Sequence, residues 1–293
     1  MLRIEFIKNS LVTILGMSSL KELYKFSEEL PTEENKMPLL FVGHGSPMNA
    51  IEDNEFSQRW SKISKEIPQP KAMLCISAHW LTKGTHVTAM QHPKTIHDFG
   101  GFPKALFDVQ YPAPGNPALA IEVKELIKST NAGLNHDWGL DHGTWSVVKQ
   151  MYPDAKIPVL QLSIDYDKPA QYHFDLAKQL SALRQKGVLI IGSGNMIHNL
   201  RLVAMDRINE GEFGFDWAFE MNDIFKKNIS ERNFSSLINY ESLGSAAKLA
   251  IPTPDHYYPM IYALGLVENN EDISFFNDKV VGGSASMTSF KAQ

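Results

Sequence analysis

The sequence predicts an α/β fold in which helices cover both faces of a sheet. Short apolar runs alternate along the chain with stretches of helical periodicity, and this alternation is typical of α/β domains. Several of the runs are apolar at consecutive positions, as strands buried on both faces are. A length of 293 residues, with 43% hydrophobic and 21% charged residues, fits one large or two small globular domains.

The first 36 residues are predicted to form a helix and a linker outside the main domain. Ser19 and Glu22 match a capping box, and apolar residues follow at helical spacing, so we expect a helix over residues 20–30. Pro31 ends this pattern, and the charged stretch up to Lys36 is typical of a linker. The main domain is therefore expected to span residues 37–293.

Apolar runs and helical periodicity place the elements of this domain in order. Five runs predict strands over Leu39–Val42, Met73–Ile76, Val87–Met90, Val159–Ile164 and Val188–Ile191. Three stretches predict helices over Ala118–Lys128, Pro169–Lys186 and Asp216–Ile229. Antiparallel edge strands are expected over Thr85–Met90 and Ser284–Phe290. The long segment 91–117 is rich in proline, glycine and aromatic residues, and such loops are more often functional than idle.

Net charge and cysteine content exclude several classes of protein. A net charge of −5 gives no general attraction to nucleic acid or to acidic membranes, so neither is expected as a partner. The single cysteine, Cys75, excludes a disulfide framework and a cysteine zinc site. It fits a reducing compartment, and we expect a cytoplasmic protein. The apolar run Leu11–Leu15 is too short to span a bilayer.

Three of the ten histidines follow predicted strands. His44 follows the first strand, His79 the second and His198 the last. Because ligands bind beyond the carboxyl ends of the strands in open α/β sheets, these side chains should meet at one edge. Imidazole is the commonest protein ligand for zinc and also suits iron. Three histidines with an open position are typical of a catalytic metal site.

Three further histidines have distinctive settings. Two prolines fix the approach to His256, and a helix is expected to begin just after it; a local hydrogen bond at a helix start is the alternative. His142 is either functional or a structural histidine paired with Asp141. His97 lies in an aromatic loop that could wall a pocket. The remaining four are expected to be exposed or structural: His86, His92, His136 and His173.

Seven motifs, in order between residues 37 and 290, resemble those of the bacterial 4,5-DOPA extradiol dioxygenase family. They are GHGSP at 43–47, SAHW at 77–80, IHDFGGFP at 96–103, YPAPG at 111–115, DHGTW at 141–145, GNMIHNLR at 194–201 and PTPDHY at 252–257. This family belongs to the class III extradiol ring-cleaving dioxygenases. The B subunit of protocatechuate 4,5-dioxygenase is a distant relative.

The resemblance implies a single α/β domain with a central mixed, mostly parallel sheet. It also implies insertion of O2 into a small-molecule catechol, beside its two hydroxyls; for DOPA the 4,5-cleavage product is 4,5-seco-DOPA. One divalent metal ion per chain would be held by His44, His79 and His256, the last standing where the protocatechuate enzyme has a glutamate. Fe(II) would supply oxygenase activity, and Zn(II) would also fit as the bound ion.

The resemblance further implies roles for residues around the ion. His198 matches the catalytic acid/base of the protocatechuate enzyme, and its nearness to the ion would also let it act as a fourth ligand. His142 would orient the substrate or handle protons. Because aromatic side chains line most small-molecule pockets, four residues are predicted to contact the substrate ring: His97, Trp80, Trp145 and Tyr257. Plain core packing is the alternative for each of these aromatic residues.

Two other functions would use the same histidines. A zinc-dependent hydrolase would lower the pKa of a bound water, with His198 or His142 carrying the proton. The lack of a His-Glu-x-x-His helix argues against it. A non-catalytic metal-binding protein would turn over no catechol. The sequence carries no signal for the oligomeric state.

Overall fold

A large mixed sheet lies at the centre of the computed structural model, which describes residues 36–208 and 210–293. Eight strands form it within those ranges: β1 Leu39–Gly43, β2 Ala72–Thr82, β3 His86–Thr88, β4 Gly133–Asn135, β5 Val159–Asp165, β6 Val188–Gly194, β7 Ile273–Phe276 and β10 Ser289–Ala292. They stand in the order β4-β3-β5-β2-β6-β1-β10-β7. Two short strands, β8 Val280–Val281 and β9 Ala285–Ser286, pair separately.

Most neighbours in the large sheet run parallel. The pairs β1–β6, β6–β2, β2–β5 and β3–β4 are parallel, whereas β3–β5, β1–β10 and β10–β7 are antiparallel. The predicted α/β domain with a mixed, mostly parallel sheet is confirmed. All five apolar runs contain strands, because their side chains are buried on both faces of the sheet.

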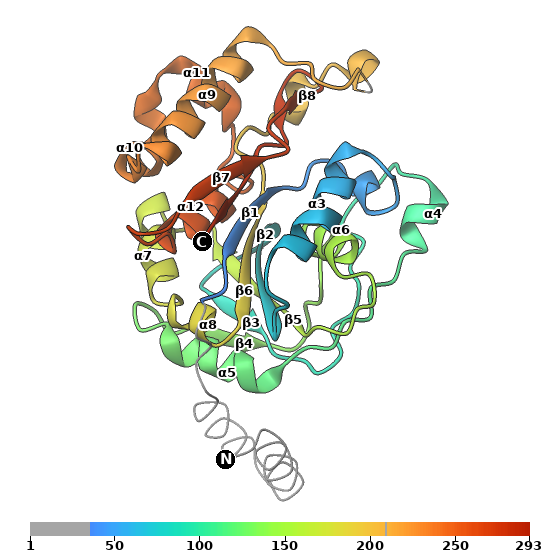
Figure 1. Ribbon diagram of the computed structural model, residues 1–293, viewed down its shortest axis with the longest axis vertical. Coiled ribbons are helices and arrows are strands. Elements are labelled where there is room, and N and C mark those ends of the chain that lie inside the picture. Colours follow the sequence, from blue (N-terminus) through green and yellow to red (C-terminus); the bar gives the residue numbers. More distant parts are fainter. Residues whose placement is uncertain (1–35, 209) are drawn as a thin grey trace, which may run out of the picture.

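Helices cover both faces, and Figure 1 shows the sheet between them. One layer holds α3 Glu55–Glu66 and α6 His142–Met151, and the other holds α7 Ala170–Lys178 and α12 Tyr258–Gly265. Successive residues of β1 point to opposite layers: Leu39 and Phe41 pack with α7 and α12, and Leu40 and Val42 pack with α3 and α6. This alternation explains why the strand is apolar at every position.

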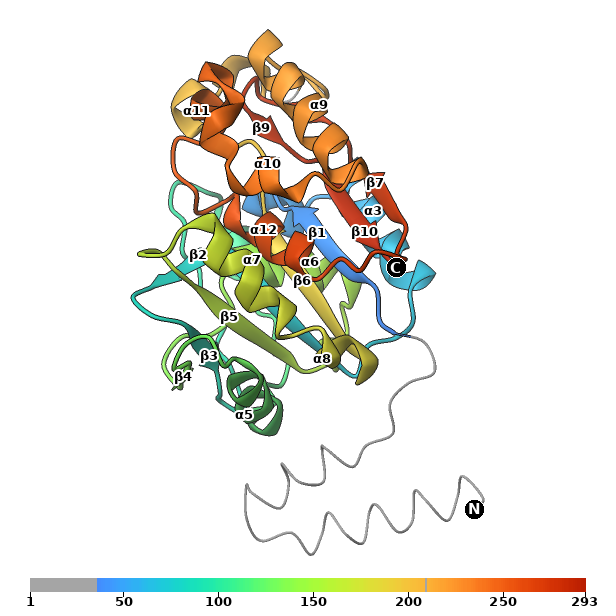
Figure 2. The same ribbon diagram turned by 90° about the vertical axis from the view of Figure 1, so that its left-hand side faces the viewer.

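The remaining helices are shorter or lie at one end of the molecule. They are α4 Lys104–Phe107, α5 Pro117–Leu126, α8 Ala182–Gln185, α9 Asp216–Ser230, α10 Phe234–Ile238 and α11 Ser245–Ala250. Figure 2 shows α9, α10 and α11 gathered at the end beyond α12. The predicted helices at 118–128 and 216–229 correspond to α5 and α9.

The prediction of one helix over Pro169–Lys186 is wrong, because the chain forms α7 and α8 with a break between them. At the break the backbone tightens: the N–H of Leu180 bonds to the carbonyl of Ala177, three residues back. The side chain of Gln179 accepts hydrogen bonds from the N–H groups of Lys128 and Ser129, at 2.6 and 3.1 Å. This side chain thereby joins the break to the segment that follows α5.

Both predictions of edge strands are also wrong in position. The segment 85–90 contains β3, which is antiparallel to β5 as expected. However, β3 is not at the edge of the sheet, because β4 pairs with its other side and forms the edge. The segment 284–290 is divided between β9 and β10. Strand β10 is not at the edge either, because β7 pairs with it and forms the other edge of the sheet. The true edges have only three and four residues, too few for a strand period to stand out.

The predicted helix over residues 20–30 lies outside the described residues. Within the described ranges, a helix with the length and hydropathy of a membrane span does not occur.

Candidate metal centre

Histidines from several elements meet beside the carboxyl ends of the central strands. His44 directly follows β1, and His256 lies two residues before α12. His79 was expected to follow the strand predicted over Met73–Ile76, and this is wrong. Strand β2 continues to Thr82, with a register shift against β5 between Ile76 and Leu81, so His79 lies within the strand. Such an irregularity can redirect a side chain without ending the strand, and His79 lies within it, beside the carboxyl ends of the central strands.

His44, His79 and His256 form a compact group. Their rings are 5.0–5.3 Å apart between centroids, and one ring nitrogen of each lies within 4.8 Å of the others. The Nε2 atoms of His44 and His79 are 3.2 Å apart. Two nitrogen ligands of a tetrahedral zinc ion, at about 2.0–2.1 Å from the metal, are separated by about 3.3 Å. The donor set and its spacing therefore fit a divalent ion.

Each ring in this group presents its Nδ1 to an acceptor on its outer side. His256 donates from Nδ1 to Asp255 at 2.5 Å. The hydroxyl of Ser193 donates to a backbone carbonyl, so it accepts from His44 Nδ1 at 3.0 Å. Nδ1 of His79 lies 3.3 Å from a carboxylate oxygen of Asp98. With Nδ1 directed outward, Nε2 is the nitrogen left to hold a metal, as in known metal sites.

Burial keeps the imidazoles of His44 and His79 neutral. It lowers the pKa of His44 well below its usual value, and the neighbouring His79 lowers it further. Burial also lowers the pKa of His79, with His142 adding to the effect and the Asp98 carboxylate opposing it. Because a metal binds only unprotonated imidazole, neutral rings are ready to act as ligands at neutral pH.

His198 lies flat against His256. The ring centroids are 3.5 Å apart and the planes differ by 10°. Burial, with His256 as the next cause, lowers the pKa of His198 to about 3, so this ring is neutral at pH 7. Together with Asp255, the two histidines form a second group that could hold an ion, which overlaps the first.

His142 pairs with Asp98, whereas the sequence suggested its neighbour Asp141. Its Nδ1 lies 2.9 Å from one oxygen of Asp98, and its backbone N–H donates to the other oxygen at 2.9 Å. The buried Asp141 caps α6 and accepts hydrogen bonds from Ser77 and Gln161, at 2.7 and 2.6 Å. Burial raises the pKa of Asp141, and Asp98 adds to this increase.

Of the four residues predicted to contact the substrate, His97 and Trp145 lie beside Phe99 on the His142 side of the group. The centroids of Phe99 and His142 are 5.4 Å apart, and the ring of His97 packs on Trp145 at 5.6 Å. His97 Nε2 donates to the carbonyl of Val109 at 2.9 Å, and the buried Trp145 donates to another loop carbonyl at 2.8 Å. These contacts hold the segment 96–109 against α6.

The other two pack against aromatic side chains outside the histidine group. Trp80 is buried and stacks on Trp138 at 5.8 Å. Tyr257 is buried, and its hydroxyl donates to the carbonyl of Leu237 at 2.9 Å. Contact between these side chains and a substrate stays a prediction.

Sequence reasoning assigned no role to the acceptors Asp98, Ser193 and Asp255, nor to Gly143. A Cβ at Gly143 would lie 2.5 Å from the hydroxyl of Ser77 and 2.8 Å from Cδ2 of His79, so any larger residue would force these side chains to shift. For the two aspartates the sequence held a signal, since each is adjacent to a histidine. Ser193 and Gly143 become neighbours of the site only in the folded chain.

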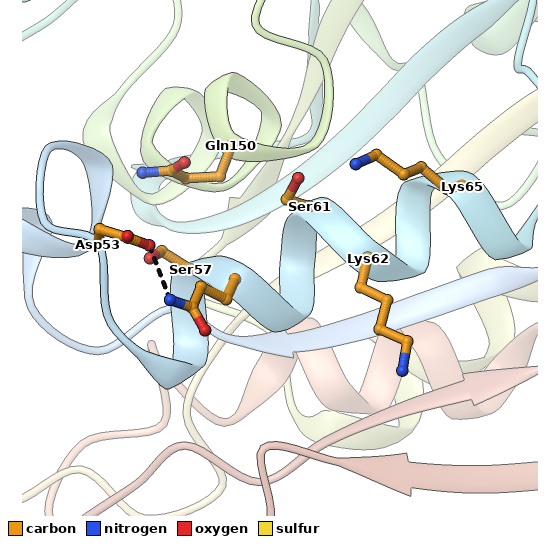
Figure 3. A pocket seen from close by; sticks show the side chains of 7 residues that line it. Asp53, Ser57, Ser61, Lys62, Lys65 and Gln150 are labelled. Carbon is orange, nitrogen blue, oxygen red and sulfur yellow. Dashed lines mark hydrogen bonds between the residues drawn. The ribbon is translucent and has the colours of Figure 1, made fainter.

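A separate pocket of about 300 Å³ lies on the surface between α3 and α6 (Figure 3). Seven side chains line it: Asp53, Ser57, Gln58, Ser61, Lys62, Lys65 and Gln150. Gln58 donates to Asp53 at 3.0 Å. None of the histidines of the candidate metal centre lines this pocket.

Comparison with known proteins defines the class to which this fold and site belong. Residues 38–286 match the family described as the catalytic LigB subunit of aromatic ring-opening dioxygenase, and the chain belongs to this family. LigB dioxygenases are metal-dependent, which agrees with the group of histidines that could hold a metal.

Individual relatives indicate which dioxygenases of this family the chain is similar to. A protein of Escherichia coli K12 named 4,5-DOPA dioxygenase extradiol is 44% identical over 266 residues, 89% of this chain and 97% of the relative. A Beta vulgaris protein of the same name is 34% identical over 270 residues, 89% and 98% of the two chains. A crystal structure of an uncharacterized Escherichia coli K12 protein has a TM-score of 0.75 at 40% identity, covering 87% of this chain and 99% of the other. The present chain is an extradiol ring-cleaving dioxygenase that uses a small-molecule substrate and O2.

Proposed function

We propose that His44, His79 and His256 hold one divalent ion, Fe(II) in the active enzyme, and that the substrate is a catechol such as DOPA, cleaved to 4,5-seco-DOPA. The observation that carries the metal assignment is the shared orientation of the three rings, each with Nδ1 turned to an outer acceptor. The names of the Escherichia coli and Beta vulgaris relatives support DOPA as a substrate.

Iron is favoured over zinc by the chemistry of the reaction. When bound, Fe(II) supplies the electron transfer between an electron-rich ring and O2 that ring cleavage needs, whereas zinc has no redox chemistry. The three imidazoles would hold either ion. A zinc-filled protein is therefore expected to be folded and inactive.

His198 is proposed as the acid/base. A catechol must lose at least one hydroxyl proton before it binds a metal through both oxygens. His198 is neutral at pH 7, and its ring lies against that of His256, so it is placed to take this proton. The protonated ring can later return the proton to the opening substrate. A position as fourth ligand is the alternative role for this residue.

His142 is proposed to orient the substrate. Its Nδ1 is directed to Asp98, which leaves Nε2 available to a substrate hydroxyl. The ring of Phe99 beside it offers an apolar surface for a flat aromatic ring, in keeping with the predicted role of the neighbouring His97 and Trp145. All of these residues lie within 37–293, which we propose as the catalytic domain.

Family membership gives the zinc hydrolase and the non-catalytic metal-binding protein no support. The decisive experiment compares metal-free protein loaded anaerobically with Fe(II) and with Zn(II). Each form is mixed with air-saturated buffer and a panel containing catechol, protocatechuate and DOPA. We expect O2 uptake and the visible absorbance of a ring-opened product with Fe(II) only. Activity of the zinc form, or none of the iron form with any catechol, would contradict the proposal.

A further inference from the structure

We infer that Asp98 is a positioning residue that sets the orientation and tautomer of two histidines at once, His79 and His142. The inference rests on the proposed function, because it takes His79 as a metal ligand. One oxygen of Asp98 lies 2.9 Å from Nδ1 of His142 and 3.3 Å from Nδ1 of His79. The other oxygen accepts the backbone N–H of His142 at 2.9 Å.

A residue that only accepts hydrogen bonds suits these contacts: the hydrogen bonds from His142, and the 3.3 Å approach of Nδ1 of His79. An ionised carboxylate has no proton to donate, so each facing imidazole nitrogen is stabilised when it carries its own proton. Both rings then hold the proton on Nδ1 and have an unprotonated Nε2. In His79 that nitrogen lies 3.2 Å from Nε2 of His44, within the proposed metal group. In His142 it is free to accept a proton from substrate.

The surroundings hold Asp98 in place. On one side His97 is tied to Val109, and on the other Phe99 packs edge-on against His142. The backbone N–H that Asp98 accepts is the first of helix α6, where a negative charge is favourable. Because the rings of His79 and His142 have centroids only 3.9 Å apart, a single carboxylate can reach both.

Replacing Asp98 by asparagine keeps the shape of the side chain but exchanges one acceptor oxygen for an NH₂ donor. If its oxygen keeps the backbone N–H of His142, its NH₂ group faces both Nδ1 atoms. The rings must then accept there, which moves their proton to Nε2. For His79 a proton on Nε2 competes with a metal. Asp108→Asn is the matched control, since Asp108 lies in the same segment 96–109 and its carboxylate pairs with the exposed Lys104, away from the histidines.

The first test measures the zinc affinity of full-length wild-type, Asp98→Asn and Asp108→Asn proteins by competition with a chromogenic chelator. Loss of an outer partner of a metal-binding histidine typically weakens metal affinity about 10–100-fold. We expect a loss of that size for Asp98→Asn and none for Asp108→Asn. Equal affinity of Asp98→Asn and wild type would overturn the role assigned toward His79.

The second test reads the tautomer directly, by two-bond ¹⁵N–¹H NMR of histidine-labelled, zinc-loaded protein. The signals of His142 are assigned by their loss in His142→Gln. We expect the proton on Nδ1 in wild type and on Nε2 in Asp98→Asn. A wild-type ring protonated on Nε2 would overturn the inference even if the variant fails to fold. If wild type bound no zinc at all, the proposed function would fall, and the role toward His79 with it.

Discussion

At the scale of single residues, the candidate site depends on which nitrogen each imidazole presents. Three acceptors fix this choice: the hydroxyl of a serine for His44, and the carboxylates of two aspartates for His79 and His256. The histidines themselves could be found from sequence, because they follow strands or precede a helix. The hydroxyl of Ser193 could not, since it meets a ring 149 residues away in the chain.

Removing a proposed ligand should abolish metal binding and leave the fold intact. In His44→Ala or His79→Ala, one of three imidazoles is lost, so the affinity should fall by more than the roughly 10–100-fold that loss of an outer partner costs. Metal content after dialysis, measured with circular dichroism on the same samples, checks this. Full occupancy in both variants would show that the ligands are elsewhere.

His198→Gln should separate catalysis from metal retention. As the acid/base, His198 is expected to contribute about 10²–10⁴-fold to kcat, the usual range for a positioned proton carrier. Iron content should fall much less than in His44→Ala. The measurement is kcat per bound iron with a catechol. If the variant loses iron as completely as His44→Ala, His198 is a ligand, and His142 becomes the candidate base.

At the scale of elements, the first turn of α6 acts as a platform for the site, meaning that its residues 141–143 make contacts that position the side chains around the histidines. Asp141 caps the helix, the backbone of His142 binds Asp98, and the carbonyl of Gly143 accepts from Ser193. The sequence did not predict this helix, because DHGTW has the glycine and aspartate of a turn. The buried strands could be predicted, because a run of consecutive apolar residues is typical of a strand that is buried on both faces of the sheet.

Gly143→Ala should therefore weaken metal binding, although residue 143 has no side chain in the site. The added Cβ would lie 2.8 Å from Cδ2 of His79 and 2.5 Å from the hydroxyl of Ser77, so both must shift. Overpacking of this kind costs about 1–3 kcal/mol. Zinc affinity and the free energy of unfolding are both expected to fall. Gly100→Ala is the control, because its Cβ meets nothing within 4 Å; equal results for the two variants would contradict the platform role.

The packing of α7 on α12 should make stability depend on pH. His173 is buried between them, beside Tyr262, and burial lowers its pKa from 6.5 to about 4. The unfolded chain then binds the proton more readily, so stability is full above pH 6.5 and falls as the pH drops towards 4. The shift corresponds to about 3 kcal/mol. In metal-free protein, His173→Gln should lose less unfolding free energy than wild type between pH 7.5 and 4.5; parallel losses would refute this.

At the scale of the whole molecule, one buried arginine ties together segments that are distant in sequence. Arg184 donates to the carbonyls of Met37 and Leu266, at 2.8 and 2.9 Å, and forms an ion pair with the buried Glu271. Lys36 adds a second cation 2.8 Å from Glu271. Residues 36 and 37 are therefore joined to the end of α12 and to the segment before β7. A linker pattern in the sequence could not reveal this, because it depends on partners more than 140 residues away.

We expect the N-terminal segment to be dispensable for chemistry, and the contacts of Lys36 add a prediction about stability. All proposed catalytic residues lie after residue 43, so chains lacking residues 1–35 or 1–36 should keep the turnover per bound iron of the full chain. The two deletions should differ in stability, because only the second removes Lys36, which also lies 2.8 Å from Glu268. A partly exposed ion pair is worth about 1 kcal/mol at most, and Lys36→Gln in the full chain should reproduce that loss in urea unfolding. A large loss of turnover in both deletions, with iron content unchanged, would mean that the first 35 residues contribute to the site.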